Sequence, residues 1–357
     1  MFRTRVALFV GVAFATTILT AQTVAPPQQP AVAAPVLELP VQTAPALEPP
    51  VQAEPQSRSK QTPTYEDWTT IDLTKSGLPL EAIGSVPLSK ADIKGCTQEL
   101  HRLTWRSNDP VDLYIIRPQG KQKLPVVLFL YDYTVDTSVT FPQDRWCDVA
   151  TRNGFAVAGF PSALSLQRIR APRPLKQWFV SELQEALASS THDVEMVLNY
   201  METRGDLDLK HVGVVGQGSG GAIAILAAAA DSRISALDLM DPWGDWPDWL
   251  KGSKQIPEEE RAAYLKPEFL QQVSSLDPVI YLPQLKGRAI RIQQVLTDTI
   301  TPPAARDKIA KAAPAADEVT RYPDIAAEAK GLGSNGIIKW LGEQLGSVNI
   351  AGERTSH

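Results

Sequence analysis

The sequence of 357 residues has only two cysteines and four histidines, and it contains no long block of basic residues. Two cysteines exclude a disulfide-rich fold, so stability must come from a hydrophobic core, for which the chain is long enough. Lysine and arginine (35) nearly balance aspartate and glutamate (40), which leaves a net charge of −5. This balance argues against a nucleic-acid partner.

The first 21 residues have the features of a secretory signal peptide. Arg3 and Arg5 precede an apolar stretch from Val6 to about Leu19, and Ala21 is a small residue suited to cleavage. A stretch of about 14 apolar residues is short against the ~20 that a membrane-spanning helix needs. We therefore predict an exported protein, periplasmic or secreted, with no membrane span after signal cleavage. An uncleaved anchor, which would leave the protein tethered, is the alternative.

Residues 22–57 contain nine prolines and no glycine or aromatic residue. Such a segment cannot form a core, which predicts a disordered leader or an extended tether that separates a folded domain from a membrane or wall. We expect residues 58–95 to be an N-terminal extension that packs on the domain. The domain itself is predicted to span residues 96–347, followed by a tail at 348–357.

Export would place Cys96 and Cys147 in an oxidising compartment, where they could pair. Closing a loop of about 50 residues would stabilise the fold by about 4 kcal/mol in the chain-entropy model. Two buried free thiols are the alternative, and the sequence leaves both open. Neither cysteine lies near a candidate catalytic histidine, so we assign no nucleophilic role to either.

The order of the predicted elements is that of an α/β protein. Residues 99–105 and 111–117 alternate apolar and polar side chains around a turn, which predicts an antiparallel hairpin. Apolar runs and helical stripes follow it. Strands are predicted at 125–131, 155–160, 212–215, 235–239, 289–296 and 318–322, and helices at 181–202, 304–313 and 334–345. This alternation predicts one doubly wound, mostly parallel sheet.

Residues 213–224 read GVVGQGSGGAIA, a strand, a glycine-rich sharp turn and the start of an alanine-rich helix. The segment resembles the nucleophile elbow, G-x-S-x-G, of the α/β-hydrolase superfamily, and in particular of its dienelactone-hydrolase and prolyl-oligopeptidase-like members. The resemblance extends from Cys96 to Leu345, about 250 residues. It implies the α/β-hydrolase fold, with a leading antiparallel hairpin and a small tryptophan-rich cap inserted at about 241–275.

The resemblance places a glycine where the family has its nucleophile. The elbow needs small residues two positions before and after the nucleophile, because strand and helix backbones approach closely there. Gly216 and Gly220 meet this need around Gly218. Taking Ser219 as a displaced nucleophile puts Gln217 at the first small position, which fits less well. In the family, the residue at Ser219 lends its backbone N–H to the oxyanion hole.

Of the other triad members, only the acid has a match. Asp298 follows a strand in the sequence LTDTITP, which resembles the family's D-x-x-x-P. The loop after residues 321–323 should carry the histidine, but Lys330 lies at about that position, and a protonated lysine is a poor general base. The four histidines all lie elsewhere in the predicted fold: His101, His192, His211 and His357.

The oxyanion region reads Tyr131-Asp132-Tyr133-Thr134, where the family often has H-G. A carboxylate at Asp132 would oppose a developing oxyanion, which is a second reason against acyl transfer. Acid–base chemistry by Asp132 with Asp298 is a less favoured alternative. We take Tyr131 and Asp132 as candidate ligand-binding residues.

Three tryptophans lie in a stretch of seven residues within the predicted cap. Aromatic faces with carboxylates between them can hold a sugar, a peptide or a cation, whereas packing of the cap onto the body is the simpler interpretation. The candidate ligand-binding residues here are Trp243, Trp246 and Trp249. A basic stretch upstream is expected to be a solvated loop: Arg168, Arg170, Arg173 and Lys176.

Gly216, Gly218 and Gly221 also fit the dinucleotide-binding pattern G-x-G-x-x-G, with Asp238 near the end of the next strand. That pattern normally opens its domain, whereas here it follows several strands, so we keep it as a second alternative.

Taken together, the substitutions predict an exported pseudo-hydrolase without catalysis. It would bind an unknown small molecule, glycan or peptide in the vestigial pocket near Gly218 and Asp298, with no cofactor and no metal. The first alternative is a serine esterase or peptidase that uses Ser219 with Asp298.

Overall fold

A computed structural model describes residues 65–120, 122–165, 168, 178–315, 318–333 and 336–346. The predicted signal peptide, tether and tail lie outside the described residues, as do Arg170, Arg173, Lys176 and His357. Within the described ranges, no helix combines the length and the apolar content needed to cross a membrane.

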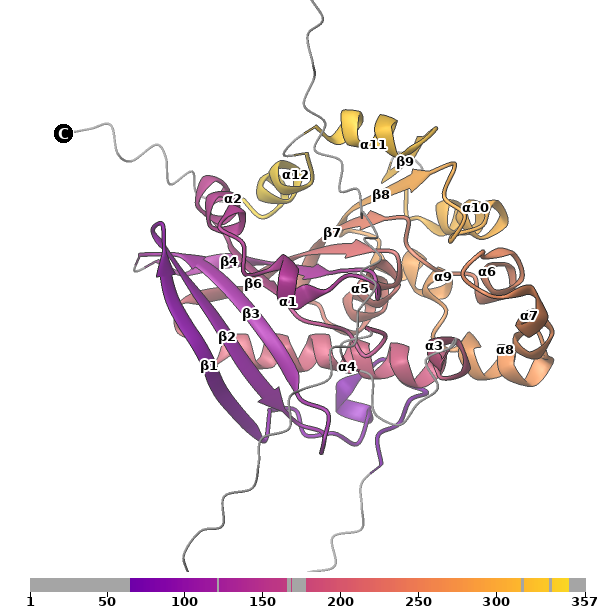
Figure 1. Ribbon diagram of the computed structural model, residues 1–357, viewed down its shortest axis with the longest axis horizontal. Helices are drawn as coiled ribbons and strands as arrows, with labels where there is room; N and C mark the ends of the chain where they lie inside the picture. Colours follow the sequence, from indigo (N-terminus) through magenta and orange to yellow (C-terminus); the bar gives the residue numbers. More distant parts are fainter. Residues whose placement is uncertain are drawn as a thin grey trace, which may run out of the picture. The chain divides into compact units, whose positions relative to one another are not determined.

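The apolar runs of the sequence form the centre of a sheet with nine strands in the described part of the chain (Figure 1). In spatial order these are β1 (Gly84–Ile93), β2 (Cys96–Thr104), β3 (Val111–Pro118), β5 (Ala156–Gly159), β4 (Leu124–Leu130), β6 (Leu207–Gln217), β7 (Ile234–Met240), β8 (Ala289–Val295) and β9 (Val319–Tyr322). The pairs from β1 to β5 are antiparallel and those from β5 to β9 are parallel. The predicted fold class, a mostly parallel sheet behind a leading antiparallel part, is confirmed.

Helices cover both faces of this sheet. They are α1 (Thr137–Thr140), α2 (Arg145–Asn153), α3 (Trp178–Ser181), α4 (Leu183–Glu202), α5 (Ser219–Ala230), α6 (Trp246–Gly252), α7 (Glu258–Tyr264), α8 (Pro267–Ser274), α9 (Pro278–Tyr281), α10 (Pro303–Ala312), α11 (Ile325–Leu332) and α12 (Gly336–Gln344). Helices α6 to α9 lie between β7 and β8, where the tryptophan-rich cap was predicted. Short 3-10 turns occupy Leu73–Lys75 and Leu282–Leu285.

The two faces of the sheet bury separate hydrophobic clusters. Successive side chains of a strand point to opposite faces, so Val126 and Leu128 of β4 join the cluster on the α4 and α5 side. Val127 points the other way, into a cluster with Trp146 of α2 and Leu341 of α12. Burial on both faces explains why the central strands read as continuous apolar runs.

Two elements differ from the sequence predictions. Strand β1 precedes the predicted hairpin and pairs with β2 along its whole length, so the leading antiparallel part is larger than a hairpin. Helix α11 occupies the segment after β9 that was expected to be a loop. Both elements contain few or no fully buried residues, unlike the central strands.

A buried network of charges joins the segment before β1 to α4. Asp193 of α4 pairs with both Arg106 and Arg168, and Arg168 also contacts Asp109 at 2.8 Å. Arg106 in turn donates to Glu66 at 2.7 Å. The prediction that Arg168 lies in a solvated loop is wrong, because its guanidinium is buried and both of its carboxylate partners lie inside the fold.

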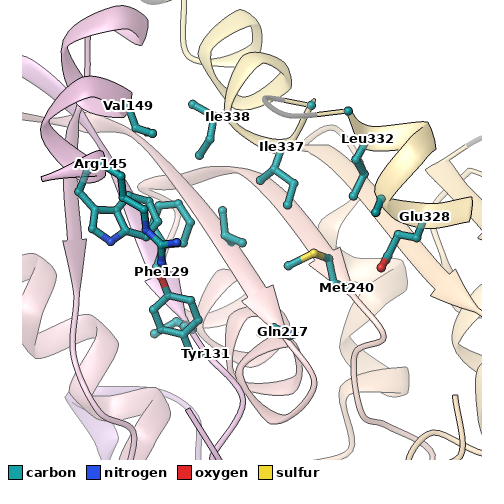
Figure 2. Close-up of a pocket in the computed structure, with 16 residues that line it drawn as sticks. Phe129, Tyr131, Arg145, Val149, Gln217, Met240, Glu328, Leu332, Ile337 and Ile338 are labelled. Carbon is teal, nitrogen blue, oxygen red and sulfur yellow. The ribbon is translucent and has the colours of Figure 1, made fainter. Parts of the chain in front are cut away.

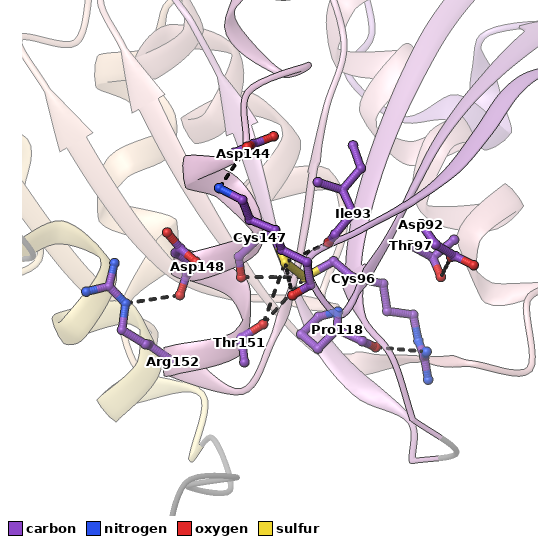
Figure 3. Close-up of a disulfide and its surroundings, with 12 residues drawn as sticks. Asp92, Ile93, Cys96, Thr97, Pro118, Asp144, Cys147, Asp148, Thr151 and Arg152 are labelled. Atoms are coloured by element: carbon purple, nitrogen blue, oxygen red, sulfur yellow. Dashed lines mark hydrogen bonds and ion pairs between the residues drawn. A yellow bond between two sulfur atoms is a disulfide. The ribbon is translucent and has the colours of Figure 1, made fainter.

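Cys96 and Cys147 form a disulfide with Cα atoms 5.7 Å apart (Figure 3). The bridge joins the first residue of β2 to α2, so it connects an antiparallel strand to a helix of the parallel part. The free-thiol alternative is therefore wrong, and neither sulfur is available as a nucleophile.

Candidate active-site cavity

The elbow predicted from the sequence lies between β6 and α5. Its central residue, Gly218, has φ +54° and ψ −115°, a backbone conformation that residues with a side chain rarely adopt. The flanking glycines are required by close backbone contacts. A Cβ at Gly220 would lie 2.0 Å from the carbonyl oxygen of Leu130, and one at Gly216 would lie 2.7 Å from the Cα of Gly221.

The space beside Gly218 is filled by a carboxylate. A Cβ built on Gly218 would lie 2.4 Å from Oδ1 of Asp132. The same oxygen accepts hydrogen bonds from the backbone N–H and from the hydroxyl of Ser219, each at 3.1 Å. Asp132 therefore occupies the place where the side chain of a nucleophile would begin.

Both backbone donors of the expected oxyanion hole have partners within the protein. In α/β-hydrolases these donors belong to the residue after the nucleophile and to a loop after an earlier strand. Here the N–H of Ser219 donates to Asp132, and the N–H of Tyr133 donates to the hydroxyl oxygen of Ser219 at 2.8 Å. Ser219 is fully buried, so its hydroxyl serves this internal network.

A cavity of about 340 Å³ opens at the carboxyl ends of β4, β6, β7 and β8. Among the described residues, Gly218 and Trp243 line it, together with four acidic side chains and no basic ones. The four are Asp132, Asp241, Asp298 and Glu328. Asp132 and Asp298 were candidate residues from the sequence, whereas Asp241 and Glu328 were not assigned to the site.

Burial shifts two of these carboxyl groups toward their neutral forms. The pKa of Asp241 is raised to about 7, mainly by desolvation, with smaller contributions in the same direction from the charges of Asp298 and Glu328. Desolvation also raises the pKa of Glu328, and Asp238 adds to this shift. Among the described residues, Oε1 of Glu328 is buried without a hydrogen-bond partner.

Asp298 lies in the cavity, and no histidine of the described residues lines that cavity with it. Its carboxylate accepts the backbone N–H groups of Ile300 and Thr301 at 2.9 and 2.8 Å, so it caps its own turn. None of the three described histidines lines the cavity. His101 contacts Glu99 and Tyr200, His192 contacts Glu66 and the carbonyl of Thr70, and His211 lies early in β6.

The register of helix α11 determines which of its side chains reaches the cavity. Its N-terminus is capped by Asp324, whose carboxylate accepts the N–H of Ala327 at 2.8 Å. In the resulting helical register Glu328 lines the cavity, whereas Lys330 is exposed and does not. The sequence analysis places Lys330 at about the position of the family's histidine because it expects a loop there.

The three tryptophans of the cap have different surroundings. Trp243 lines the cavity, while Trp246 and Trp249 are buried and line neither of the cavities described here. The rings of Trp243 and Trp249 lie 4.6 Å apart, and those of Trp246 and Trp249 meet edge to face at 5.8 Å. For these last two, packing of the cap is the role that the structure supports.

A second cavity of about 480 Å³ adjoins the first (Figure 2). It lies between α2, α11 and α12 and the ends of β4, β6 and β7, and Tyr131 is among its lining residues. Gln217, Met240 and Glu328 line both cavities, so the two adjoin at these side chains.

The geometry of the glycine-rich turn does not favour a dinucleotide. The carboxylate of Asp132 lies at the N-terminus of α5, where it would repel a pyrophosphate. Asp238, which would bind the ribose, is fully buried and bonded to Arg291 and Gln293. A Cβ at Gly221 would meet Pro242 at 2.8 Å, so packing accounts for this glycine.

Neither a protein-family model nor a curated protein matches this sequence. Solved structures do resemble its fold. An acetyl xylan esterase from Paenibacillus sp. aligns with 16% identity and a TM-score of 0.55, over 73% of this chain and 88% of that one. An S-formylglutathione hydrolase from Agrobacterium tumefaciens aligns with 14% identity and a TM-score of 0.54, over 72% and 99%. An acetyl xylan esterase from Thermoanaerobacterium sp. aligns with 15% identity and a TM-score of 0.52, over 67% and 81%.

Proposed function

We propose that this chain, which has the α/β-hydrolase fold, is an exported protein that binds a ligand beside Gly218 without hydrolysing it. The observation that carries the proposal is the position of Asp132, whose carboxylate fills the space of a nucleophile side chain. The same carboxylate takes the N–H of Ser219.

Ester hydrolysis on this fold needs an activated nucleophile and free donors for the developing oxyanion. At Gly218 there is no side chain to attack. The two donors are engaged by Asp132 and Ser219, and a negative carboxylate beside them opposes a second negative charge. Gly218 thus offers no nucleophile, and both oxyanion donors already have partners within the protein.

The alternative nucleophile, Ser219, has unfavourable surroundings. To attack a substrate, its hydroxyl would have to leave Asp132 and Tyr133 and reach the cavity from a fully buried position. A base would also be needed, and the described lining of the cavity contains carboxyl groups but no histidine. Because the solved structures with similar folds include esterases, ester hydrolysis is the alternative that the experiment below tests.

Export is part of the same proposal. The N-terminal residues were predicted to be a signal peptide, and the disulfide between Cys96 and Cys147 is typical of proteins in oxidising compartments. The proposed ligand is a small molecule, a glycan or a peptide that enters the cavity at Gly218.

The proposal is tested by measuring turnover of p-nitrophenyl acetate and butyrate, together with labelling by a serine-directed fluorophosphonate. We expect neither turnover nor labelling in the parent protein. Ser219→Ala serves as the matched control, and it should behave as the parent does. Turnover in the parent that disappears in Ser219→Ala would show that the protein is a hydrolase with a displaced nucleophile.

A further inference from the structure

The second cavity is mostly apolar. Trp146 and Val149 of α2 face Ile337 and Ile338 of α12 across it, and Leu332 of α11 closes another side. Figure 2 shows these helices around an open space above the strand ends. With a volume of about 480 Å³, the cavity has room for an aromatic ring or a short alkyl chain.

The boundary between the two cavities carries a carboxyl group. Glu328 extends from α11 toward Met240, and both residues line both cavities (Figure 2). A buried polar atom without a partner costs free energy, and a ligand that donates to Oε1 of Glu328 would remove that cost. A group that bridges the two cavities would pass beside this carboxyl group.

The charges of the first cavity restrict the polar end of such a ligand. Its ionisable lining residues within the described chain are all acidic, so a cation is attracted and an anion is repelled. The basic residue of the second cavity, Arg145, is exposed and lies over the ring of Trp146 at 5.4 Å. Its charge acts on Tyr131, which lines the second cavity and not the first.

An organic cation fits this arrangement better than a metal ion. Among the described residues, no group of three or more His, Cys, Asp or Glu side chains is placed to hold a metal. An ammonium group needs only hydrogen-bond acceptors and an opposite charge, while an attached apolar group gains from burial.

We infer that the two cavities form one site for a small molecule that has an amine at one end and an apolar chain or ring at the other. The amine lies beside Glu328 in the acidic cavity, and the apolar group lies between α2 and α12. The inference rests on the proposed function, because it names the ligand class of the same site.

The first test compares three ligands of one carbon skeleton: 4-phenylbutylamine, 4-phenylbutanol and 4-phenylbutyrate. Isothermal titration of the mature exported chain at pH 8 should detect the amine. We expect the neutral alcohol to bind about tenfold more weakly, which corresponds to about 1.4 kcal/mol, and the carboxylate to bind more weakly still. Equal or tighter binding of the carboxylate, or displacement of the amine by calcium chloride, would overturn the inference.

The second test uses variants that separate the two ends of the site. Glu328→Gln should reduce binding of the amine to the level of the alcohol and leave the alcohol unchanged. Ile338→Trp fills the apolar cavity and should weaken both ligands alike. Lys330→Gln lies on the same helix but is exposed, and it should change neither.

Two outcomes are distinguishable for the proposal as a whole. If the parent hydrolyses esters, the proposed function is wrong whatever it binds. If the parent is inactive but does not distinguish the amine from the alcohol, the further inference alone is wrong. Because the ligand series is measured on the parent, this conclusion does not depend on whether Glu328→Gln folds.

Discussion

At the scale of single residues, Asp132 and Gly218 depend on each other. A side chain at Gly218 would overlap the carboxylate of Asp132, and the carboxylate has room only because position 218 is glycine. The two residues therefore share one space. The effect of a substitution at either position therefore depends on the residue at the other.

This dependence predicts a double-mutant cycle. Gly218→Ala should destabilise the fold by about 2–4 kcal/mol, because it adds a steric overlap to an unfavourable positive φ. In an Asp132→Ala background the overlap disappears and only the backbone strain remains, so the cost should fall. Urea unfolding of the four proteins measures the coupling. Purely additive costs would contradict the proposed contact.

Asp241 predicts a pH dependence of stability. Its folded-state pKa of about 7 lies above the unfolded value of 3.8, so the folded state holds a proton that the unfolded state has lost. Stability is therefore lost as pH rises from about 4 to about 7. Asn can adopt the positive φ of this residue and still accept the N–H of Val295.

Asp241→Asn removes this ionisation. The stability of the variant relative to the parent should therefore be greater at pH 8 than at pH 5, by on the order of 2 kcal/mol. Urea unfolding at the two pH values measures the difference. Asp112→Asn, at a half-buried surface carboxyl group, serves as a control, and a pH-independent difference for Asp241→Asn would count against a buried carboxyl group.

Parts of the site could be predicted from residue spacing and parts could not. Gly218 and Asp298 follow from short motifs at strand ends, because backbone geometry there depends on neighbouring residues. Glu328 and Asp241 are brought to the cavity by the register of α11 and by the turn after β7. These positions depend on tertiary packing, which a single sequence does not display.

At the scale of elements, the N-terminal cap of α11 is expected to contribute to the stability of this helix. The helix has no buried residue, and Asp324 caps its first turn. Asp324→Ala should destabilise the helix locally by about 1 kcal/mol, with a smaller effect on global unfolding. Faster hydrogen exchange confined to α11, with weaker binding of 4-phenylbutylamine, is the expected result. Unchanged exchange would mean that packing, not the cap, holds this helix.

The same property explains which elements could be predicted. The central strands bury both faces and therefore read as apolar runs, and α4 buries most of its length. Strand β1 is exposed almost throughout, and α11 has no fully buried residue. Neither element contains the long buried apolar run that identified the central strands, and neither was derived from the sequence.

At the scale of the whole molecule, the buried charges couple the N-terminal segment to α4. Asp193→Asn leaves Arg106 and Arg168 without their shared carboxylate and should cost about 3–5 kcal/mol. Asp112→Asn, which breaks the more exposed pair with Arg102, should cost less than about 1 kcal/mol. Chemical unfolding of both variants tests this contrast. Similar costs would show that burial of the network contributes little.

The disulfide should stabilise the folded chain as a unit. Its sequence separation is 51 residues, and a loop of that size corresponds to about 4 kcal/mol in the chain-entropy model. Replacing both cysteines by alanine should therefore cost a similar amount. Because both cysteines are buried, the replacement does not disturb exposed groups. The double variant Cys96→Ala/Cys147→Ala is therefore expected to unfold at a lower urea concentration than the parent.

Adding a reductant tests the disulfide bond itself without replacing the cysteine side chains. Dithiothreitol should lower the unfolding midpoint of the parent toward that of the double variant and leave the variant itself unchanged, because only the parent has a bond to break. Counting free thiols in the denatured parent provides an independent check. Two titratable thiols without reductant would contradict the disulfide, and with it the argument from oxidation state to an exported protein.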